Sequence, residues 1–178
     1  MQPEDQRPIE IREEQAADHA AVFKLHQAAF GQDDEANLVD ALRQSDAFIP
    51  ALSLVALIDD VVVGHILFTR IRIRNGSGEE VDSLALAPVA VLPAHQRCGI
   101  GGRLIRAGLA MARRLGHASC IVLGHQEYYP RFGFRPASAW AIKAPFDVSD
   151  DVFMAMELVP YGLRGVSGVV VYPGAFGS

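Results

Sequence analysis

Three glycines, Gly99, Gly101 and Gly102, lie between an apolar run and a helical pattern, where they could bind an anion. At the first turn of a helix the backbone N–H groups lack partners, and the helix dipole adds partial positive charge. Glycine has no Cβ, so an anion can approach those N–H groups closely. We therefore expect the amides of residues 97–102 to hold a phosphate or pyrophosphate group.

The spacing of the glycines narrows the class of anion. No Gly-Lys-Ser/Thr follows them, so the phosphate-loop pattern of nucleoside triphosphatases is absent. The dinucleotide pattern GxGxxG also fails, because Leu104 occupies the third glycine position. The plain alternative is a glycine-rich turn that only starts a helix. What does fit is Gln96-x-x-Gly99-x-Gly101, which resembles the acetyl-coenzyme A signature of the GNAT superfamily of N-acetyltransferases.

A second segment, residues 124–134, resembles another element of that family, FYxxxGF. Tyr129 matches the tyrosine of this element, and Gly133-Phe134 matches its last two residues. The stretches Gly64-His-Ile, 86–91 and 128–134 are similar to a bacterial branch of uncharacterised predicted acetyltransferases. The resemblance runs through nearly the whole chain, from Ile9 to Leu158.

The resemblance implies an enzyme that transfers an acetyl group from acetyl-CoA to a primary amine by direct attack in a ternary complex. The strand before the loop would pair with the peptide-like pantetheine arm through Val89, Ala90 and Val91. Pro88 cannot donate to a strand ladder, so it favours a bulge there, although it could equally mark an irregular strand end. The cofactor-binding residues of the loop would be Gln96, Arg97, Cys98, Gly99, Ile100, Gly101 and Gly102.

Two residues are expected to take part in the chemistry. The resemblance implies that the N–H of Val89 polarises the acetyl carbonyl, an interaction of a type worth about 3 kcal/mol in the transition state. Tyr129 would return a proton to the departing thiolate, and packing under the short helix is the alternative role for its ring. We expect the neighbouring Tyr128 to point elsewhere.

The sequence offers several candidates for the general base. An alkylammonium has a pKa near 10.4, so the acceptor must lose a proton. The family's glutamate on the strand before the loop, where it occurs, would align near Ala85, which cannot serve as a base. His125, Glu35, Asp82, His65 and water are the alternatives. The missing acid keeps a second function open, an acyl-CoA sensor without turnover; a nucleotide-binding domain is a third.

Composition bounds the remaining possibilities. The 178 residues include 16 Lys and Arg against 21 Asp and Glu, a net charge of −5 that disfavours general nucleic-acid binding. The polar start of the chain and the short apolar runs predict neither a signal peptide nor a membrane span.

The two cysteines, Cys98 and Cys120, form no metal-binding pattern, so we expect no metal and a cytoplasmic location. A helix N-terminus lowers a thiol pKa, which leaves the reactivity of Cys98 open. The acceptor, a small molecule or a peptide, and a homodimer also stay open.

Elements must hold these residues in place, and their order predicts a mixed α/β fold. We expect a flexible tail at residues 1–7 and a single N-acetyltransferase-like domain at 8–178. The resemblance implies a mixed, mostly antiparallel sheet of six or seven strands with about four helices around it. The residue patterns predict strands at 9–11, 52–58, 61–74, 81–92, 120–123, 140–143 and 152–158, with an edge strand at 169–171. They predict helices at 18–30, 35–43 and 101–115 and a helical turn at 127–132.

Overall fold

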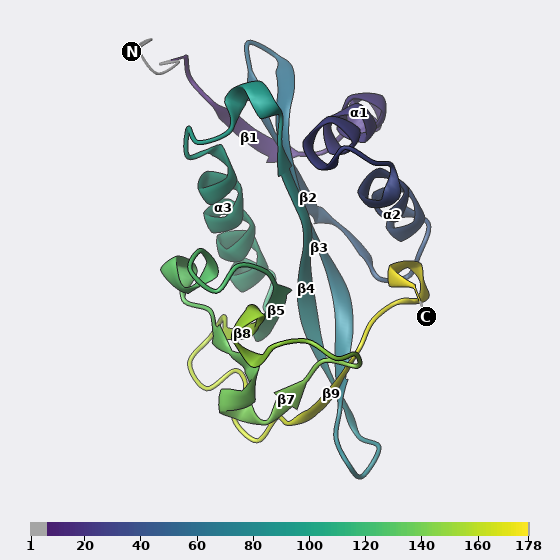
Figure 1. Ribbon diagram of the computed structural model, residues 1–178, viewed down its shortest axis with the longest axis vertical. Coiled ribbons are helices and arrows are strands. Elements are labelled where there is room, and N and C mark those ends of the chain that lie inside the picture. Colours follow the sequence, from purple (N-terminus) through teal and green to yellow (C-terminus); the bar gives the residue numbers. More distant parts are fainter. Residues whose placement is uncertain (1–6, 178) are drawn as a thin grey trace.

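The sheet begins with four antiparallel strands that follow one another along the chain (Figure 1). The computed structural model describes residues 7–177, so the expected tail, apart from Arg7, lies outside the described residues, and the boundary at residue 8 stays a prediction. The strands are β1 (Glu10–Glu13), β2 (Phe48–Ile58), β3 (Val61–Arg74) and β4 (Glu80–Val91). β2 begins before the predicted Leu52, because Phe48 already pairs with Thr69 across a register irregularity.

The second half of the sheet contains the crossover. β5 (Ser119–Leu123) runs parallel to β4, while β8 (Phe153–Glu157) is antiparallel to β5 and β6 (Arg135–Pro136) is antiparallel to β8. The strand order is β1-β2-β3-β4-β5-β8-β6. A parallel neighbour requires a crossover connection, which here contains the third helix.

Two short strands complete the sheet and correct two expectations. The strand predicted at 169–171 forms as β9 (Gly168–Val171), but it pairs with both β3 and β7 (Ile142–Lys143), so its predicted place at the edge is wrong. It lies beside residues Arg72–Arg74 of β3, beyond the last residue that β2 pairs with. The strand predicted at 140–143 is shorter, because Ala137–Trp140 forms a 3-10 turn and Ala141 has a φ of 55°. The described residues form nine strands, more than the expected six or seven; among them β6, of two residues, is too short to leave a sequence pattern.

Helices cover both faces of the sheet (Figure 1). α1 (His19–Phe30) and α2 (Asp34–Arg43) lie on one face, and α3 (Ile100–Arg114) lies on the other. Within residues 7–177 these are the three α-helices, fewer than the expected four, because residues Tyr129–Phe132 form only a 3-10 turn. None of the helices in the described part of the chain is long and apolar enough to cross a membrane.

The central strands are buried on both faces, as expected for β5. Cys120 and Val122 belong to the core under α3, whereas Ile121 belongs to a second core on the opposite face. Cys120 is fully buried, which makes it a core residue and raises the pKa of its thiol. α3 approaches the sheet closely because Gly108 has no side chain: a Cβ there would lie 2.1 Å from a ring carbon of Phe68. This contact fixes α3, and with it the glycine loop, against β3.

Candidate active site

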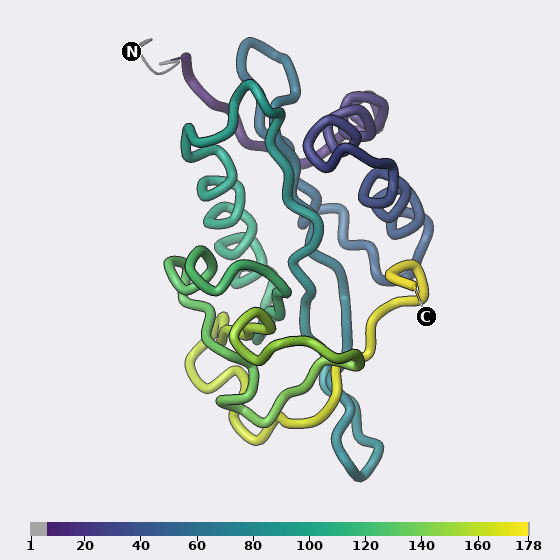
Figure 2. Tube along the Cα trace, in the orientation of Figure 1, coloured from purple at the N-terminus to yellow at the C-terminus, as the bar shows by residue number. Residues whose placement is uncertain are grey.

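β4 and β5 separate from one another at the middle of the sheet (Figure 2). The two strands pair at Ala85 and Ile121. Beyond that pair β4 continues to Val91, whereas β5 ends at Leu123. We call the point where the two strands separate the vertex. Beyond the vertex, the side of β4 that faces away from β3 is open, so a ligand can pair with the β4 backbone there.

A bulge in β4 lies at the start of this open segment. Leu86 pairs with Phe68 and Val89 with Ile66, so β4 contains one residue more than β3 between these pairs. The extra residue falls at Ala87 or Pro88, which confirms the predicted bulge. Such a bulge bends the strand and turns its backbone groups toward the opening.

The open segment of β4 carries free backbone groups. The N–H of Leu92 donates to the carbonyl of Val63 at 2.9 Å, which places Leu92 in a hydrogen-bonded pair with β3. Pairs alternate along an antiparallel ladder, so Ala90 also turns its backbone groups toward β3. Val89 and Val91 consequently direct their N–H and C=O groups to the open side. The role predicted for Val89 needs such a free N–H, while a contact of Ala90 with the cofactor stays a prediction.

The loop after β4 is shaped by two residues with left-handed backbone. Arg97 has a φ of 66° and Gly99, which precedes α3, has a φ of 81°. The side-chain amide of Gln96 donates to the carbonyl of Val91 at 3.0 Å and so ties the loop to the open edge of β4. The first intrahelical bond runs from the Arg103 N–H to the Gly99 carbonyl at 3.1 Å.

The N–H groups that precede this bond form the anion cradle, which we define as the amides of residues 97–102. Those of Ile100, Gly101 and Gly102 precede the first helical bond and have no partner inside the helix. No side chain caps α3, and residues 97–99 are exposed. A diphosphate fits such a cradle, because it needs several donors and the positive end of a helix dipole.

Two arginines of α3 add positive charge near the cradle and were not among the residues predicted from the sequence. Arg106 lies over the ring of Phe132 at 4.9 Å, and its Nη1 would be 3.2 Å from a Cβ placed on Gly102. Arg103 follows the cradle directly and donates to the carbonyl of Ile9 at 3.4 Å. They lie three residues apart, and therefore on the same side of a helix that begins with glycines. This spacing could have identified them from the sequence.

The two neighbouring tyrosines occupy different places. The Tyr129 ring is buried against the end of β5: a Cβ on Gly124 would lie 2.2 Å from that ring. Burial raises the pKa of Tyr129 to about 12, so its phenol carries a proton at neutral pH. Tyr128 is half-buried, and its hydroxyl lies 3.4 Å from the Cβ position of Gly101, beside the cradle. The two adjacent tyrosines thus place their rings in different surroundings, Tyr128 beside the cradle and Tyr129 against the end of β5, and the role of Tyr129 stays a prediction.

Three of the candidate bases lie on the surface. Asp82 is at the end of β4 remote from the bulge, and its side chain is 94% exposed. Glu35 lies on α2 and accepts a hydrogen bond from the Gln32 amide at 2.7 Å. His125 is exposed directly after β5 and lines a cavity of about 610 Å³ together with Tyr128. Of these three residues, His125 is nearest in sequence to the end of β5, beside the opening between β4 and β5.

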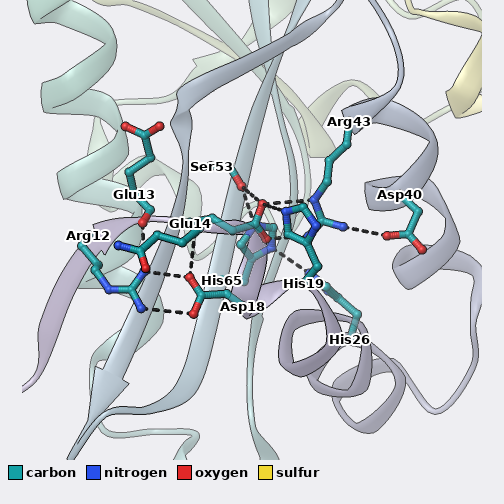
Figure 3. Close-up of polar contacts among 11 residues, drawn as sticks. Arg12, Glu13, Glu14, Asp18, His19, His26, Asp40, Arg43, Ser53 and His65 are labelled. Carbon is teal, nitrogen blue, oxygen red and sulfur yellow. Dashed lines mark hydrogen bonds and ion pairs between the residues drawn. The ribbon is translucent and has the colours of Figure 1, made fainter.

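The fourth candidate, His65, belongs to a buried polar cluster under α1 and α2 (Figure 3). His26 Nε2 lies 2.9 Å from His65 Nδ1, and His65 Nε2 lies 2.9 Å from the Ser53 hydroxyl. That hydroxyl donates to Glu14 at 3.1 Å, and Glu14 is paired with Arg43 at 2.5 Å. The cluster joins the end of β1 to β2, β3 and both helices of this face.

The carboxylate at the end of this series of hydrogen bonds determines which nitrogen and oxygen atoms carry the protons. The Glu14 carboxylate only accepts, so Ser53 donates to it and must accept from His65 Nε2–H. His65 Nδ1 then accepts from His26 Nε2–H, which leaves a lone pair on His26 Nδ1. That nitrogen is buried and has no hydrogen-bond partner among the described residues. Both histidines are neutral, and both ring nitrogens of His65 are already engaged, so His65 stabilises the fold rather than deprotonating an amine.

We expect this histidine pair to make the protein acid-sensitive. Burial and Arg43 lower the pKa of His26 to about 4, and burial lowers the pKa of His65 as well. In the unfolded chain the histidine pKa is near 6.5, so below that pH the unfolded chain binds more protons than the folded chain. The free energy of unfolding therefore decreases as the pH is lowered. The loss from His26 alone should reach about 3 kcal/mol between pH 6.5 and pH 4. Urea unfolding across this range measures it.

The matched variant is His26→Asn, which keeps a polar group but cannot titrate. Its unfolding free energy should fall less steeply between pH 6.5 and pH 4 than that of the natural protein. Equal slopes for both proteins would show that His26 is not held neutral in the folded state.

Within residues 7–177, no group of three or more His, Cys, Asp or Glu side chains is arranged to hold a metal ion. Cys98 is exposed and free in the loop, and Cys120 is free and buried. The donors that surround the opening are therefore backbone amides, arginines and phenols, which suit a phosphate-bearing organic ligand.

Comparisons with known proteins agree with this geometry. The sequence matches the family model described as "Acetyltransferase (GNAT) domain" over residues 10–137. It is 41% identical over 139 residues to the uncharacterised N-acetyltransferase YjhQ of Escherichia coli (strain K12), covering 76% of this chain and 75% of that protein. Two solved structures share its fold. One is the GNAT family N-acetyltransferase YhbS from Escherichia coli in complex with CoA, with a TM-score of 0.88, 28% identity and coverage of 99% of this chain and 96% of that chain. The other is a GNAT family acetyltransferase from Brucella melitensis in complex with acetyl-CoA, with a TM-score of 0.78, 37% identity and coverage of 97% and 100%.

Proposed function

This chain belongs to the GNAT family of acetyltransferases, and from that premise we propose how it transfers an acetyl group from acetyl-CoA to a primary amine. The observation that carries the proposal is two groups of free donors that follow one another along the chain. The first group is the N–H groups of Val89 and Val91, and the second is the cradle at the start of α3. A pantetheine arm and a diphosphate need donors in that order, so the residues fit the cofactor.

The cradle would hold the diphosphate, and the open edge of β4 would pair with the pantetheine amides. Acetyl-CoA supplies a thioester whose carbonyl carbon an amine can attack. The Val89 N–H would donate to the carbonyl oxygen as negative charge grows there. As the new C–N bond forms and the C–S bond breaks, the Tyr129 hydroxyl would give its proton to the sulfur. The proton that the amine nitrogen loses would pass to water and from there restore the Tyr129 hydroxyl. Both substrates are bound together, so no acetylated enzyme forms.

A primary amine on a small molecule or a peptide is the proposed acceptor. The proposed location is the cytoplasm, which agrees with two free cysteines in the described chain. The proposal includes no nucleic acid or membrane partner, and a homodimer is left to measurement.

Binding and turnover should be measured on the same preparation. We expect calorimetry to detect both CoA and acetyl-CoA, and a thiol-release assay with a panel of primary amines to detect free CoA. Binding of acetyl-CoA without release of CoA on any amine would favour the acyl-CoA sensor. The reason for this alternative is that Ala85, an apolar residue, stands where the family's glutamate would align. Absence of heat from both ligands at millimolar concentration would contradict cofactor binding and the whole proposal.

A further inference from the structure

A cavity of about 890 Å³ opens beside the vertex where β4 and β5 separate. We call it the vertex cavity. Ala85, which pairs with Ile121, lines it together with Ala87 of β4 and Leu123 of β5, each two residues beyond that pair. Val89, the proposed carbonyl donor, follows Ala87 by two residues in the same strand. The cavity therefore adjoins the position where the reacting carbonyl would be held.

The vertex cavity lies on the face of the sheet opposite α3. Ala85 packs in the core that contains Ile71 and Ile121, whereas the residues of α3 pack in the other core. The anion cradle is at the start of α3, so the cavity and the cradle open on different faces. Two substrates could then approach the vertex from two sides and be bound at the same time, and a ternary complex requires this simultaneous binding.

The wall of the cavity is largely aromatic and aliphatic. Phe146 stacks on Tyr172 with ring centroids 6.2 Å apart, and Tyr172 contacts Phe176 at 5.1 Å. Phe146 is 45% exposed and Leu123 is 48% exposed, although both are large apolar side chains. Apolar surface left open inside a concave site is typical of a place where a ligand binds.

Charge is nearly absent from this wall. Arg74 is the cavity's one charged lining residue among those described, and its guanidinium lies 3.6 Å from Glu80. No Asp or Glu of the described chain lines the cavity. A polyamine or another acceptor with several positive charges would find no carboxylate to pair with there, and a buried unpaired charge is costly.

We infer that the vertex cavity binds the acceptor, and that this acceptor is a primary amine carried on an aromatic or bulky apolar group. The inference rests on the proposed acetyl transfer and adds the substrate class to it. The apolar group would fill the space beside Phe146 and Tyr172, and the nitrogen would point to the vertex.

Such a cavity also helps to remove the proton from the amine. Transfer of an ammonium group from water into an apolar site disfavours its charged form, so the proton passes to water at the rim before the nitrogen reaches the carbonyl. A carboxylate that serves as a base at the Ala85 position is then unnecessary. This explains how an apolar residue can occupy that position in an active enzyme.

The first test compares phenethylamine with 1,4-diaminobutane and ethanolamine in a thiol-release assay. We expect kcat/KM for phenethylamine to exceed the other two by roughly 30-fold or more, since burial of a ring provides that difference. Preference for 1,4-diaminobutane would overturn the acceptor class and leave acetyl transfer intact. Release of CoA with none of the three amines, on protein that binds acetyl-CoA, would overturn the inference together with turnover.

The second test removes one wall of the cavity. Phe146→Ala should lower kcat/KM for phenethylamine by roughly 10-fold and leave the KM for acetyl-CoA unchanged. Tyr161→Ala is the matched control, because Tyr161 is an exposed aromatic residue that does not line the cavity. Equal losses in both variants would overturn the inference. A dimer in sedimentation velocity that Phe146→Ala dissociates, with unchanged amine kinetics, would identify the cavity as an interface and overturn it too.

Discussion

Replacement of Tyr129 by phenylalanine should reduce turnover by about 100-fold or more while acetyl-CoA binding stays the same. The variant loses only the hydroxyl, and the ring keeps its packing against Gly124 and Phe134. The expected loss arises because the departing thiolate would no longer receive a proton. With its pKa raised to about 12, Tyr129 is protonated throughout the neutral range, so activity should not fall from its ionisation below about pH 10.

Tyr128→Phe is the control for this prediction. It removes a hydroxyl from the adjacent residue, whose tip lies beside the start of α3 rather than at the end of β5. We expect Tyr128→Phe to retain most of the turnover. Thiol release measures turnover, and calorimetry with acetyl-CoA verifies binding. If the two variants lost activity equally, or if Tyr129→Phe kept full activity, Tyr129 would not be the acid.

The substitution Gly101→Asp should weaken CoA binding by about 100-fold. It places a carboxylate at the second position of α3, within the anion cradle. Two unit charges about 6 Å apart repel by about 3 kcal/mol at an effective dielectric constant near 20, which corresponds to that factor. The new Cβ would meet its nearest atoms, Tyr128 Oη and Val91 Cγ2, at 3.4 and 3.8 Å, so the fold can accommodate it.

Gly101→Asn separates charge from size in this experiment. Asparagine has nearly the shape of aspartate but is neutral, so binding should weaken by less than about 10-fold. Acid at the start of a helix is favourable, so Gly101→Asp should be at least as resistant to urea as Gly101→Asn. Calorimetry with CoA compares the two variants. Equal affinities would mean that the diphosphate does not lie at the start of α3.

Much of this site could be predicted from the sequence, because its parts are local. The cradle needs only a strand end, three glycines and the first turn of a helix, all within residues 89–102. The dipole and the unpaired N–H groups of that turn follow from its own backbone. For the same reason the glycine pattern, together with residues 124–134, indicated the family, which the comparisons confirm, and Pro88 together with that resemblance predicted the bulge.

Tertiary structure alone decided the features that depend on distant contacts. β9 pairs with β3 from nearly a hundred residues further along the chain, and this brings Tyr172 and Phe176 to the vertex cavity near Phe146. The proton positions in the cluster of His26 and His65 likewise depend on Glu14, which the fold brings to them through Ser53. Spacing along a sequence carries helix and strand periods, but the burial of an ionisable group and the walls of a cavity come from segments that meet only when the chain folds.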